Sequence, residues 1–151
     1  QVLGVFSADW VEPLALVLQR LGSQHVLVVH AEDGLDEISV GAPTQVAELR
    51  NDTVHTYRIE PEQFGMQRSD IGCLKVADAV ASMAMIRKVF AGEPGAASDI
   101  VALNAGAAIY VAGLADSLAA GVRRAQDVIG SGTAQAKFDA LVEFSQRLSV
   151  G

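Results

Sequence analysis

The beginning of the chain alternates between apolar runs and a helical pattern, and this restricts the fold more than any other feature. Val2 to Phe6 forms one apolar run and His25 to Ala31 forms a second. From Ser7 to Leu21, between them, apolar residues recur at helical spacing, and the serine can cap the first turn. The residues on that expected face are Trp10, Leu14, Val17, Leu18 and Leu21. A strand, a helix and a strand in this order predict a βαβ unit with two buried parallel strands.

The pattern after this unit predicts a hairpin and then helices. Thr44 to Leu49 and Thr53 to Ile59 alternate apolar and polar residues on either side of a turn at Asn51 and Asp52. The polar stretch that follows is expected to be a loop. The expected helices are Leu74–Ala91, Ser98–Ala112, Asp116–Gly130 and Thr133–Leu148. The fold class is therefore α/β, with a mainly parallel central sheet, an appended hairpin and flanking helices.

Composition and charge exclude several classes of protein. Half of the 151 residues are hydrophobic but only 5% are aromatic, which is typical of a helix-rich domain with a packed core. The formal net charge is −7 and lysines and arginines are scattered, so we expect no nucleic-acid partner. Apolar stretches fall short of the roughly 20 residues of a membrane span, so we expect no membrane partner either. The single cysteine, Cys73, fits a reducing cytoplasm and is expected to be buried and inert.

Four carboxylates lie within six residues directly after the second apolar run. They are Glu32, Asp33, Asp36 and Glu37, with Gly34 between the two pairs. Because open α/β sheets bind ligands at the carboxyl ends of their strands, this segment is a candidate site. Carboxylate oxygens suit Mg²⁺, which can bring a phosphorylated substrate with it. The alternative interpretation is an acidic turn that serves only solubility.

Other chemical motifs are weak. The sequence contains no Gly-x-Ser-x-Gly, Walker or dinucleotide-binding glycine motif, and Gly130 to Gly132 falls between two expected helices. We therefore predict no catalytic residue and no cofactor-binding residue. His30, at the end of a strand, is expected to be structural. Asn104 lies in an apolar helix, where its amide is expected either to tether the core to a loop or to face a site.

The string from Leu27 to Ser39, with its Asp-Gly-Leu-Asp-Glu-Ile-Ser, resembles the metal-loop segment of the anthranilate phosphoribosyltransferase family. Further segments resemble that family in the same order. They are Gln1–Phe6, Thr44–Leu49, Pro61–Gly65, Leu103–Tyr110 and Ser117–Gly132. The resemblance implies an enzyme of tryptophan biosynthesis that joins the amine of anthranilate to C1 of phosphoribosyl pyrophosphate and releases pyrophosphate. It also implies Mg²⁺, held with the help of Asp36 and Glu37, which neutralises charge on the departing pyrophosphate.

Members of this family also carry a Gly-Thr-Gly-Gly-Asp loop, a Lys-His-Gly-Asn segment and an N-terminal helical domain, through which they dimerise. These parts do not occur in the sequence. The resemblance therefore implies that residues 1–151 are a partial C-terminal α/β domain of a homodimeric enzyme and are inactive alone. Where the family commonly has Gly-Gly-Asp and Glu-Asn-Ala, this chain has Val76-Ala77-Asp78 and Ala81-Ser82-Met83, so no role is carried over to that segment.

Two alternative functions stay open at this point. Pyrimidine nucleoside phosphorylases share the superfamily fold and perform the reverse kind of chemistry at a ribose carbon, although the acidic string favours the transferase. A non-catalytic relative that binds nucleic acid is the second alternative, and the net charge of −7 disfavours it.

Overall fold

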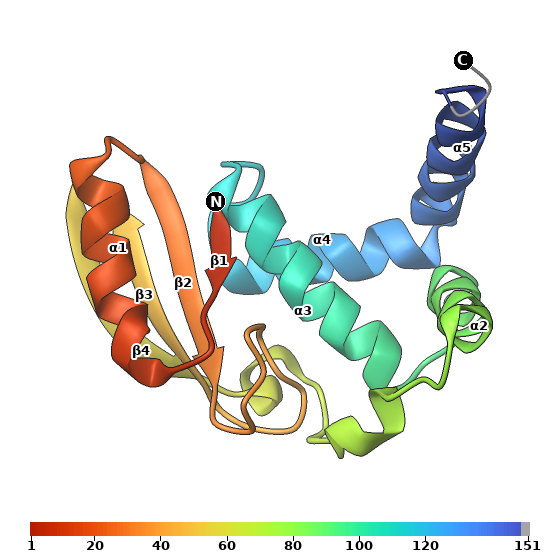
Figure 1. Cartoon of the computed structure of the whole chain (residues 1–151), viewed down its shortest axis with the longest axis horizontal. Coiled ribbons are helices and arrows are strands. Elements are labelled where there is room, and N and C mark those ends of the chain that lie inside the picture. Colours follow the sequence, from red (N-terminus) through yellow and green to blue (C-terminus); the bar gives the residue numbers. More distant parts are fainter. Residues whose placement is uncertain (149–151) are drawn as a thin grey trace.

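The computed structural model describes residues 1–148, which form a four-stranded sheet with helices packed on both faces (Figure 1). The strands lie side by side in chain order: β1 (Val2–Gly4), β2 (His25–Ala31), β3 (Thr44–Arg50) and β4 (Thr53–Ile59). The α-helices are α1 (Val11–Arg20), α2 (Ala79–Phe90), α3 (Ala96–Val111), α4 (Leu118–Gly130) and α5 (Thr133–Leu148). Short 3-10 turns are η1 (Ala8–Trp10), η2 (Pro61–Phe64) and η3 (Ile71–Leu74). The predicted α/β class is confirmed.

The predicted βαβ unit is present, with α1 between β1 and β2. The two strands pair in parallel, with Val2 opposite Leu27 and Gly4 opposite Val29. The helical segment begins where expected, because the Ser7 hydroxyl accepts a hydrogen bond from the amide of the second residue after it at 3.3 Å. This unit places the C-terminal end of β2 beside the end of β1.

The rest of the sheet is antiparallel. β3 pairs with both β2 and β4, so Thr44 lies opposite Ala31 on one side and Ile59 on the other. Asn51 and Asp52 form the turn between β3 and β4 at φ values of 51° and 59°, the conformation that two-residue hairpin turns require. The appended hairpin is confirmed, but one of the three pairings among the described strands is parallel where a mainly parallel sheet was expected. The loop from β2 reverses the chain directly into β3, without a crossover helix to return it in parallel.

Alternate side chains of β2 enter two separate cores. Val26 and Val28 pack against α1 on one face of the sheet, whereas Leu27 and Val29 pack toward α3 and α4 on the other. All four are at most 1% exposed. Coverage of both faces explains why the strand is apolar throughout rather than alternating. Each such buried side chain contributes about 1.5–3 kcal/mol relative to an exposed one.

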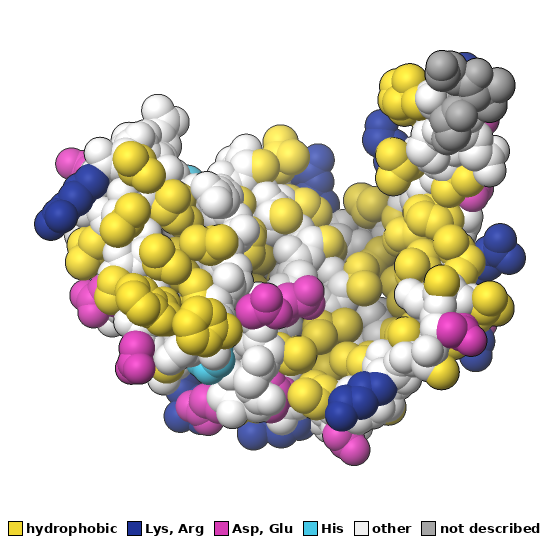
Figure 2. Space-filling view, viewed as in Figure 1, with side chains coloured by type: hydrophobic (Ala, Val, Ile, Leu, Met, Phe, Trp, Pro, Cys, Tyr) yellow, Lys and Arg dark blue, Asp and Glu magenta, His cyan; other side chains and the backbone are white. Residues whose placement is uncertain are grey.

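The apolar stripe predicted to bury α1 is confirmed in part, because Leu14 and Leu18 pack against the core on the sheet side. The helix rests on the sheet through small side chains, Val11 and Ala15, which are 4% and 0% exposed. Trp10, Val17 and Leu21 of the predicted stripe are exposed instead. Figure 2 shows hydrophobic side chains gathered over α1 on the face turned to the viewer. Small residues occupy the side of α1 that contacts the sheet, because they allow the helix axis to approach the sheet closely.

Gly106 and Gly113, in and after α3, have different structural roles. A Cβ at Gly106 of α3 would lie 2.5 Å from the Cα of Val122 on α4, so the glycine permits a close contact between the two helices. Gly113 makes no such contact and follows α3 at a φ of 72°, a conformation typical of helix ends.

In Figure 1, α4 crosses α3 and α5 projects away from the body near α2. No residue of α5 is buried within the described chain.

The helix expected to begin at Leu74 begins later, at Ala79. Asp78 caps α2 and accepts a hydrogen bond from the amide of the third residue after it at 2.8 Å. The segment before it is the turn η3 followed by a short non-helical stretch. Cys73 lies in η3 and is exposed, so the prediction of a buried thiol was wrong. A turn this short has room to bury few side chains, and its neighbour Leu74 packs against the core instead.

The remaining helix boundaries are close to the predicted ones. Ser117 caps α4, and its hydroxyl accepts an amide hydrogen bond at 3.2 Å. The helix expected to begin at Ser98 begins two residues earlier, after Gly95, and the Ser98 hydroxyl donates to the Glu93 carbonyl. Across residues 1–148 we find no helix with the length and apolar character needed to cross a membrane.

Candidate active site

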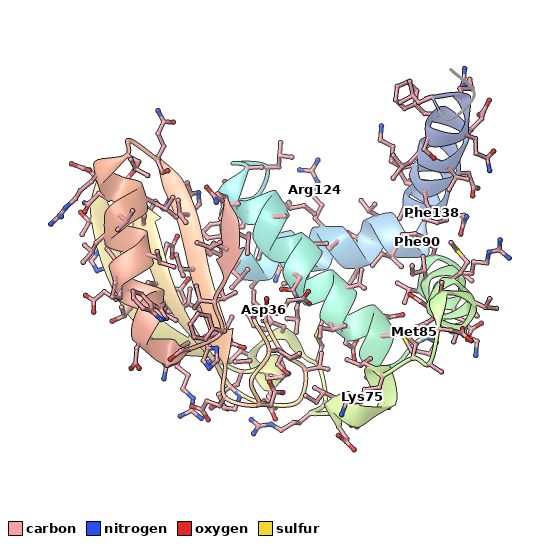
Figure 3. All side chains as sticks on the ribbon, viewed as in Figure 1. Asp36, Lys75, Met85, Phe90, Arg124 and Phe138 are labelled. Atoms are coloured by element: carbon pink, nitrogen blue, oxygen red, sulfur yellow. The ribbon has the colours of Figure 1, made fainter. Side chains whose placement is uncertain are left out.

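The acidic segment leaves the sheet at the C-terminal end of β2, as predicted. Asp36 and Glu37 are exposed, and neither carboxylate makes a hydrogen bond or ion pair with any other part of the described chain. Figure 3 shows Asp36 between the sheet and α3, near the middle of the molecule. These two carboxylates therefore remain available to a ligand, which distinguishes them from the two that precede them.

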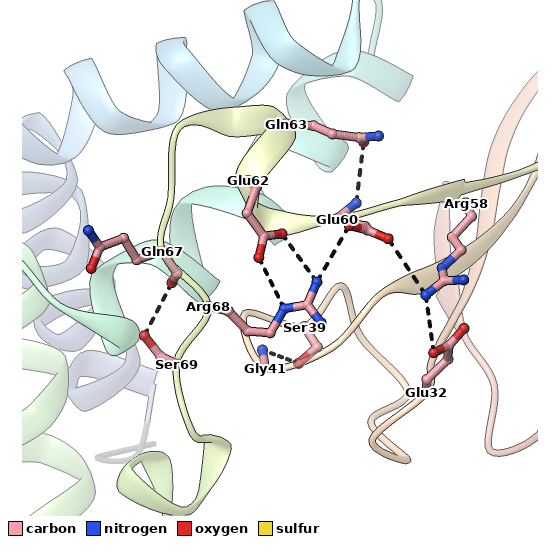
Figure 4. A network of polar contacts seen from close by, with 10 residues as sticks. All are labelled: Glu32, Ser39, Gly41, Arg58, Glu60, Glu62, Gln63, Gln67, Arg68 and Ser69. Atoms are coloured by element: carbon pink, nitrogen blue, oxygen red, sulfur yellow. Dashed lines mark hydrogen bonds and ion pairs between the residues drawn. The ribbon is translucent and has the colours of Figure 1, made fainter.

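Glu32 is engaged with an arginine. Its carboxylate lies 3.4 Å from Arg58, which also lies 3.6 Å from Glu60. Arg68 continues this exposed chain of charges, with contacts of 3.5 Å to Glu60 and 3.1 Å to Glu62 (Figure 4). The hydrogen bond from Arg68 lowers the pKa of the Glu62 carboxyl. Exposed pairs of this kind add little stability, but Arg58 already gives Glu32 a cationic partner, which Asp36 and Glu37 lack within the described chain.

Asp33 closes the loop and is a structural carboxylate. It accepts a hydrogen bond of 2.5 Å from the hydroxyl of Ser39, a residue only 1% exposed. The same hydroxyl oxygen accepts a hydrogen bond from the Gly41 amide at 2.8 Å (Figure 4). The Ser39 amide donates to the Thr44 hydroxyl at 3.1 Å. Together these bonds fix the return of the loop toward β3.

The main chain of the acidic segment is held from two further sides. Gly4 of β1 lies so close that an added Cβ would meet the carbonyl oxygen of Asp36 and would lie 2.5 Å from its carbonyl carbon. On the α3 side, Asn104 accepts a hydrogen bond from the Ile38 amide at 3.0 Å and donates to the Ile38 carbonyl at 2.9 Å. The tether predicted for Asn104 is confirmed. The role of Gly4 was missed, although a glycine inside a strand signals close backbone approach.

An apolar cavity with a volume of about 440 Å³ lies beside this pair. Asp36 and Glu37 contribute to one wall, and Lys75 is the one basic side chain among its described lining residues. Figure 3 labels Lys75 in the segment between η3 and α2. Ile86 and Val89 of α2 are among the apolar residues that line the cavity. The described wall of the chamber thus carries three charged side chains, Asp36, Glu37 and Lys75, among mostly apolar ones.

The segment that departs from the family pattern faces the same cavity. Val76 and Ser82, one from each altered stretch, are among its lining residues. Asp78 lies between them and is engaged as the cap of α2. The substitutions thus change the wall of the chamber that holds the acidic pair rather than a distant surface.

The donor groups are those of a hard cation. Within residues 1–148, no group of three or more His, Cys, Asp or Glu side chains is placed to hold a metal ion. One or two carboxylates are nevertheless the usual protein share for Mg²⁺, which completes its octahedron with waters and substrate phosphates. His30 is structural, as predicted, because its Nδ1 hydrogen-bonds the Val5 carbonyl at 2.8 Å. Asp36 and Glu37 therefore fit Mg²⁺ that arrives together with a phosphorylated molecule.

A second polar cluster joins α3 to the sheet at its other end. Glu48 accepts hydrogen bonds from Tyr110 at 2.6 Å and Tyr57 at 2.9 Å, and His25 lies 3.1 Å away. Arg50 donates to the Tyr110 hydroxyl at 2.7 Å. Burial alone would raise the pKa of Glu48, but these hydrogen bonds outweigh it and lower the pKa. Burial, followed by the nearby carboxylate, raises the pKa of Tyr57. Each of these five side chains has a hydrogen-bond partner within the cluster, so the cluster holds α3 against the sheet.

The chain is similar in sequence to a family of known proteins. The family model described as the a/b domain of the glycosyl transferase family matches residues 1–135. The anthranilate phosphoribosyltransferase of Thioalkalivibrio sulfidiphilus is 61% identical over 145 residues, which are 96% of this chain and 43% of that protein. That of Methylococcus capsulatus is 56% identical over 149 residues, 99% of this chain and 44% of that protein. The chain thus spans less than half the length of these relatives.

Solved structures show the same fold. The crystal structure of anthranilate phosphoribosyltransferase from Thermus thermophilus has a TM-score of 0.85 and 39% identity, covering 93% of this chain and 41% of that one. The Saccharomyces cerevisiae enzyme in complex with PRPP and Mg has a TM-score of 0.78 over 91% of this chain and 40% of that one, at 21% identity. On the family match and the shared fold, this chain belongs to the glycosyl transferase family, whose a/b domain extends over residues 1–135.

Proposed function

We propose that this chain is the a/b part of an anthranilate phosphoribosyltransferase, a magnesium-dependent enzyme of tryptophan biosynthesis. In the reaction, the bond between C1 of phosphoribosyl pyrophosphate and the pyrophosphate oxygen breaks, and a bond from C1 to the amine nitrogen of anthranilate forms. The relatives at 61% and 56% identity carry this name. The observation that carries the proposal is the adjacent, unpartnered pair of carboxylates at the end of β2, Asp36 and Glu37, beside a cavity.

Asp36 and Glu37 are the metal ligands in this proposal, and Mg²⁺ held there supplies neutralisation of the charge on the leaving pyrophosphate. Glu32 and Asp33 are not ligands, because Arg58 and Ser39 already engage them. Two adjacent exposed carboxylates repel each other, so a divalent cation stabilises them as well. The chain contributes alignment and electrostatics rather than proton transfer.

The proposal treats residues 1–151 as a partial C-terminal domain of a longer protein. The first two curated relatives are more than twice as long as the aligned part of this chain, which covers 43% and 44% of them. The pyrophosphate-binding loop that the family resemblance implies does not occur in the sequence. The 151-residue chain alone should therefore form no detectable phosphoribosyl anthranilate. The intact protein would act in the cytoplasm as a homodimer through its N-terminal helical domain.

The proposal is tested with Asp36→Asn combined with Glu37→Gln in the intact protein, meaning this chain with the remaining length of its relatives. We expect turnover to fall by about 100-fold or more, the size of effect produced by losing transition-state charge stabilisation. Glu32→Gln is the matched control in the same loop, and it should leave turnover unchanged because its exposed ion pair is worth little.

Turnover is followed as phosphoribosyl anthranilate formed at a series of Mg²⁺ concentrations. An unchanged Mg²⁺ dependence in the double variant would rule out the metal role of this pair. Phosphorolysis of thymidine in place of anthranilate transfer would contradict the assigned acceptor.

A further inference from the structure

Asn104 occupies an unusual position for an asparagine. It lies in the interior of α3, where asparagine is less favourable than most residues because its amide competes for backbone groups. Its side-chain NH₂ donates to the carbonyl of Ile100, one turn earlier, at 3.0 Å. The same NH₂ group donates to the Ile38 carbonyl at 2.9 Å, and its oxygen accepts from the Ile38 amide at 3.0 Å.

The side chain therefore pairs with Ile38 in the way that a neighbouring strand would. The orientation of the amide is determined by its partners, because the Ile38 N–H can only donate and the two carbonyls can only accept. Both polar main-chain groups of Ile38 are thus satisfied by one residue from 66 positions away in the chain. The Ile38 side chain is 2% exposed in the core shared with α3, so main chain and side chain are fixed together.

This contact bears directly on the acidic pair. Ile38 follows Glu37 without an intervening residue, so fixing its main chain fixes the direction in which the chain leaves the pair. On the other side, the Asp36 carbonyl rests against Gly4 of β1, where no Cβ could fit. The two exposed carboxylates consequently lie on a short stretch of backbone held at both ends. A side chain that is free to bind but fixed at its Cα loses little conformational freedom when a ligand arrives.

We infer that Asn104 is a positioning residue for the Asp36–Glu37 pair: it holds the main chain of Ile38 so that both carboxylates are presented together at the cavity. The inference rests on the proposed metal role of that pair. It adds a residue of α3, distant in sequence, that acts through the backbone rather than as a ligand. Loss of the Asn104 amide leaves both carboxylates in the chain but releases the backbone that carries them.

The test compares Asn104→Ala with Tyr110→Phe in the intact protein. Tyr110→Phe is the matched control, because it removes hydrogen bonds between α3 and the sheet at the opposite end of the same helix. The first measurement needs no activity: hydrogen exchange of the peptide covering residues 32–41, followed by mass spectrometry. Asn104→Ala should speed exchange of the Ile38 amide by about 10-fold or more, whereas Tyr110→Phe should leave it unchanged.

The second measurement is the Mg²⁺ concentration that gives half-maximal turnover. We expect it to rise about 10-fold in Asn104→Ala, the equivalent of one lost hydrogen bond, and to stay within about twofold of the parent in Tyr110→Phe. Asn104→Gln keeps the amide on a side chain one methylene longer, so it should lie between Asn104→Ala and the parent in both measurements. This variant also carries the test if Asn104→Ala does not fold.

Failure of this inference differs from failure of the proposed function. If Asp36→Asn with Glu37→Gln keeps the parent's Mg²⁺ dependence, the metal role itself is wrong. If that double variant loses Mg²⁺ dependence while the Asn104 variants match Tyr110→Phe in exchange and in Mg²⁺ requirement, the positioning role of Asn104 is overturned. Faster exchange together with a raised Mg²⁺ requirement, confined to the Asn104 variants, supports it.

Discussion

Replacing Gly4 with alanine should destabilise the sheet and displace the acidic segment. Gly4 is not among the residues with positive φ, so alanine can adopt its backbone conformation without strain. The substitution acts through space alone, because the new Cβ would meet the main chain of Asp36 and lie 2.5 Å from its carbonyl carbon. Ordinary van der Waals contact begins at 3.4 Å, and the Asp36 carbonyl oxygen would be closer still than the carbon, so β1 or the loop must move by clearly more than about 1 Å.

The size of the destabilisation depends on whether the atoms that obstruct the new Cβ can move aside. The obstructing atoms belong to the backbone rather than to a flexible side chain, and the next residues of the loop are anchored to Asn104. Overpacking of this kind costs about 1–3 kcal/mol, and the backbone contact places Gly4→Ala near the upper end of that range. We therefore expect the free energy of unfolding to fall by about 2–3 kcal/mol, a factor of roughly 30 to 150 in the folding equilibrium.

Urea unfolding followed by circular dichroism measures this change. Gly130→Ala is the control, because a Cβ at the end of α4 meets no atom within 4 Å and the position has no positive φ. That variant should be unchanged or stabilised by up to about 1 kcal/mol, since alanine favours helix over glycine. If Gly4→Ala unfolds at the same urea concentration as Gly130→Ala, the contact between β1 and the loop does not restrain the fold, and the reasoning is refuted.

Two further predictions concern the packing of α3. Gly106→Ala should lower the melting temperature by several degrees, because its Cβ would lie 2.5 Å from the Cα of Val122; a melting temperature equal to that of the parent would show that α3 and α4 can separate freely. Glu48→Gln should remove a pH dependence of stability. The lowered pKa of Glu48 stabilises the fold above the ordinary carboxyl value of 4.5, and this contribution disappears as the pH falls through the lower folded-state value. Urea midpoints of parent and variant should therefore converge as the pH falls below 4.5, and a constant difference would contradict the assignment.

Local patterns predicted the elements well where one physical effect dominated. The continuous apolar run His25–Ala31 and the Asn51-Asp52 turn each admit few structures, and both are present as expected. The directions of the strands were harder to predict, since a strand's direction depends on whether the connection before it crosses over the sheet or reverses directly. The composition of the loop after β2 does not indicate which of the two occurs. The face of α1 was predicted only in part: Leu14 and Leu18 pack against the core as expected. Trp10 and Leu21 were included because they are more apolar than Ala15, although the small side chain packs closer to the sheet.

The site was predicted only in part for a similar reason. Counting charge identified the acidic segment, but four carboxylates look equivalent in a sequence. Their environments depend on other parts of the chain: Arg58 pairs with Glu32, while Ser39 and the fold of the loop engage Asp33. Periodicity placed Asn104 in a helix but could not say that its amide meets Ile38, because that contact depends on how α3 docks on the sheet.

The exposed thiol of Cys73 offers a direct way to observe the cavity. Its neighbours in η3, Ile71 and Leu74, both line that chamber, and the sequence contains no second cysteine. Within residues 1–151, a maleimide dye will therefore attach at one place, next to the lining residue Leu74, without any engineered mutation. Its emission should change when the chamber fills, so occupancy can be read by fluorescence in real time.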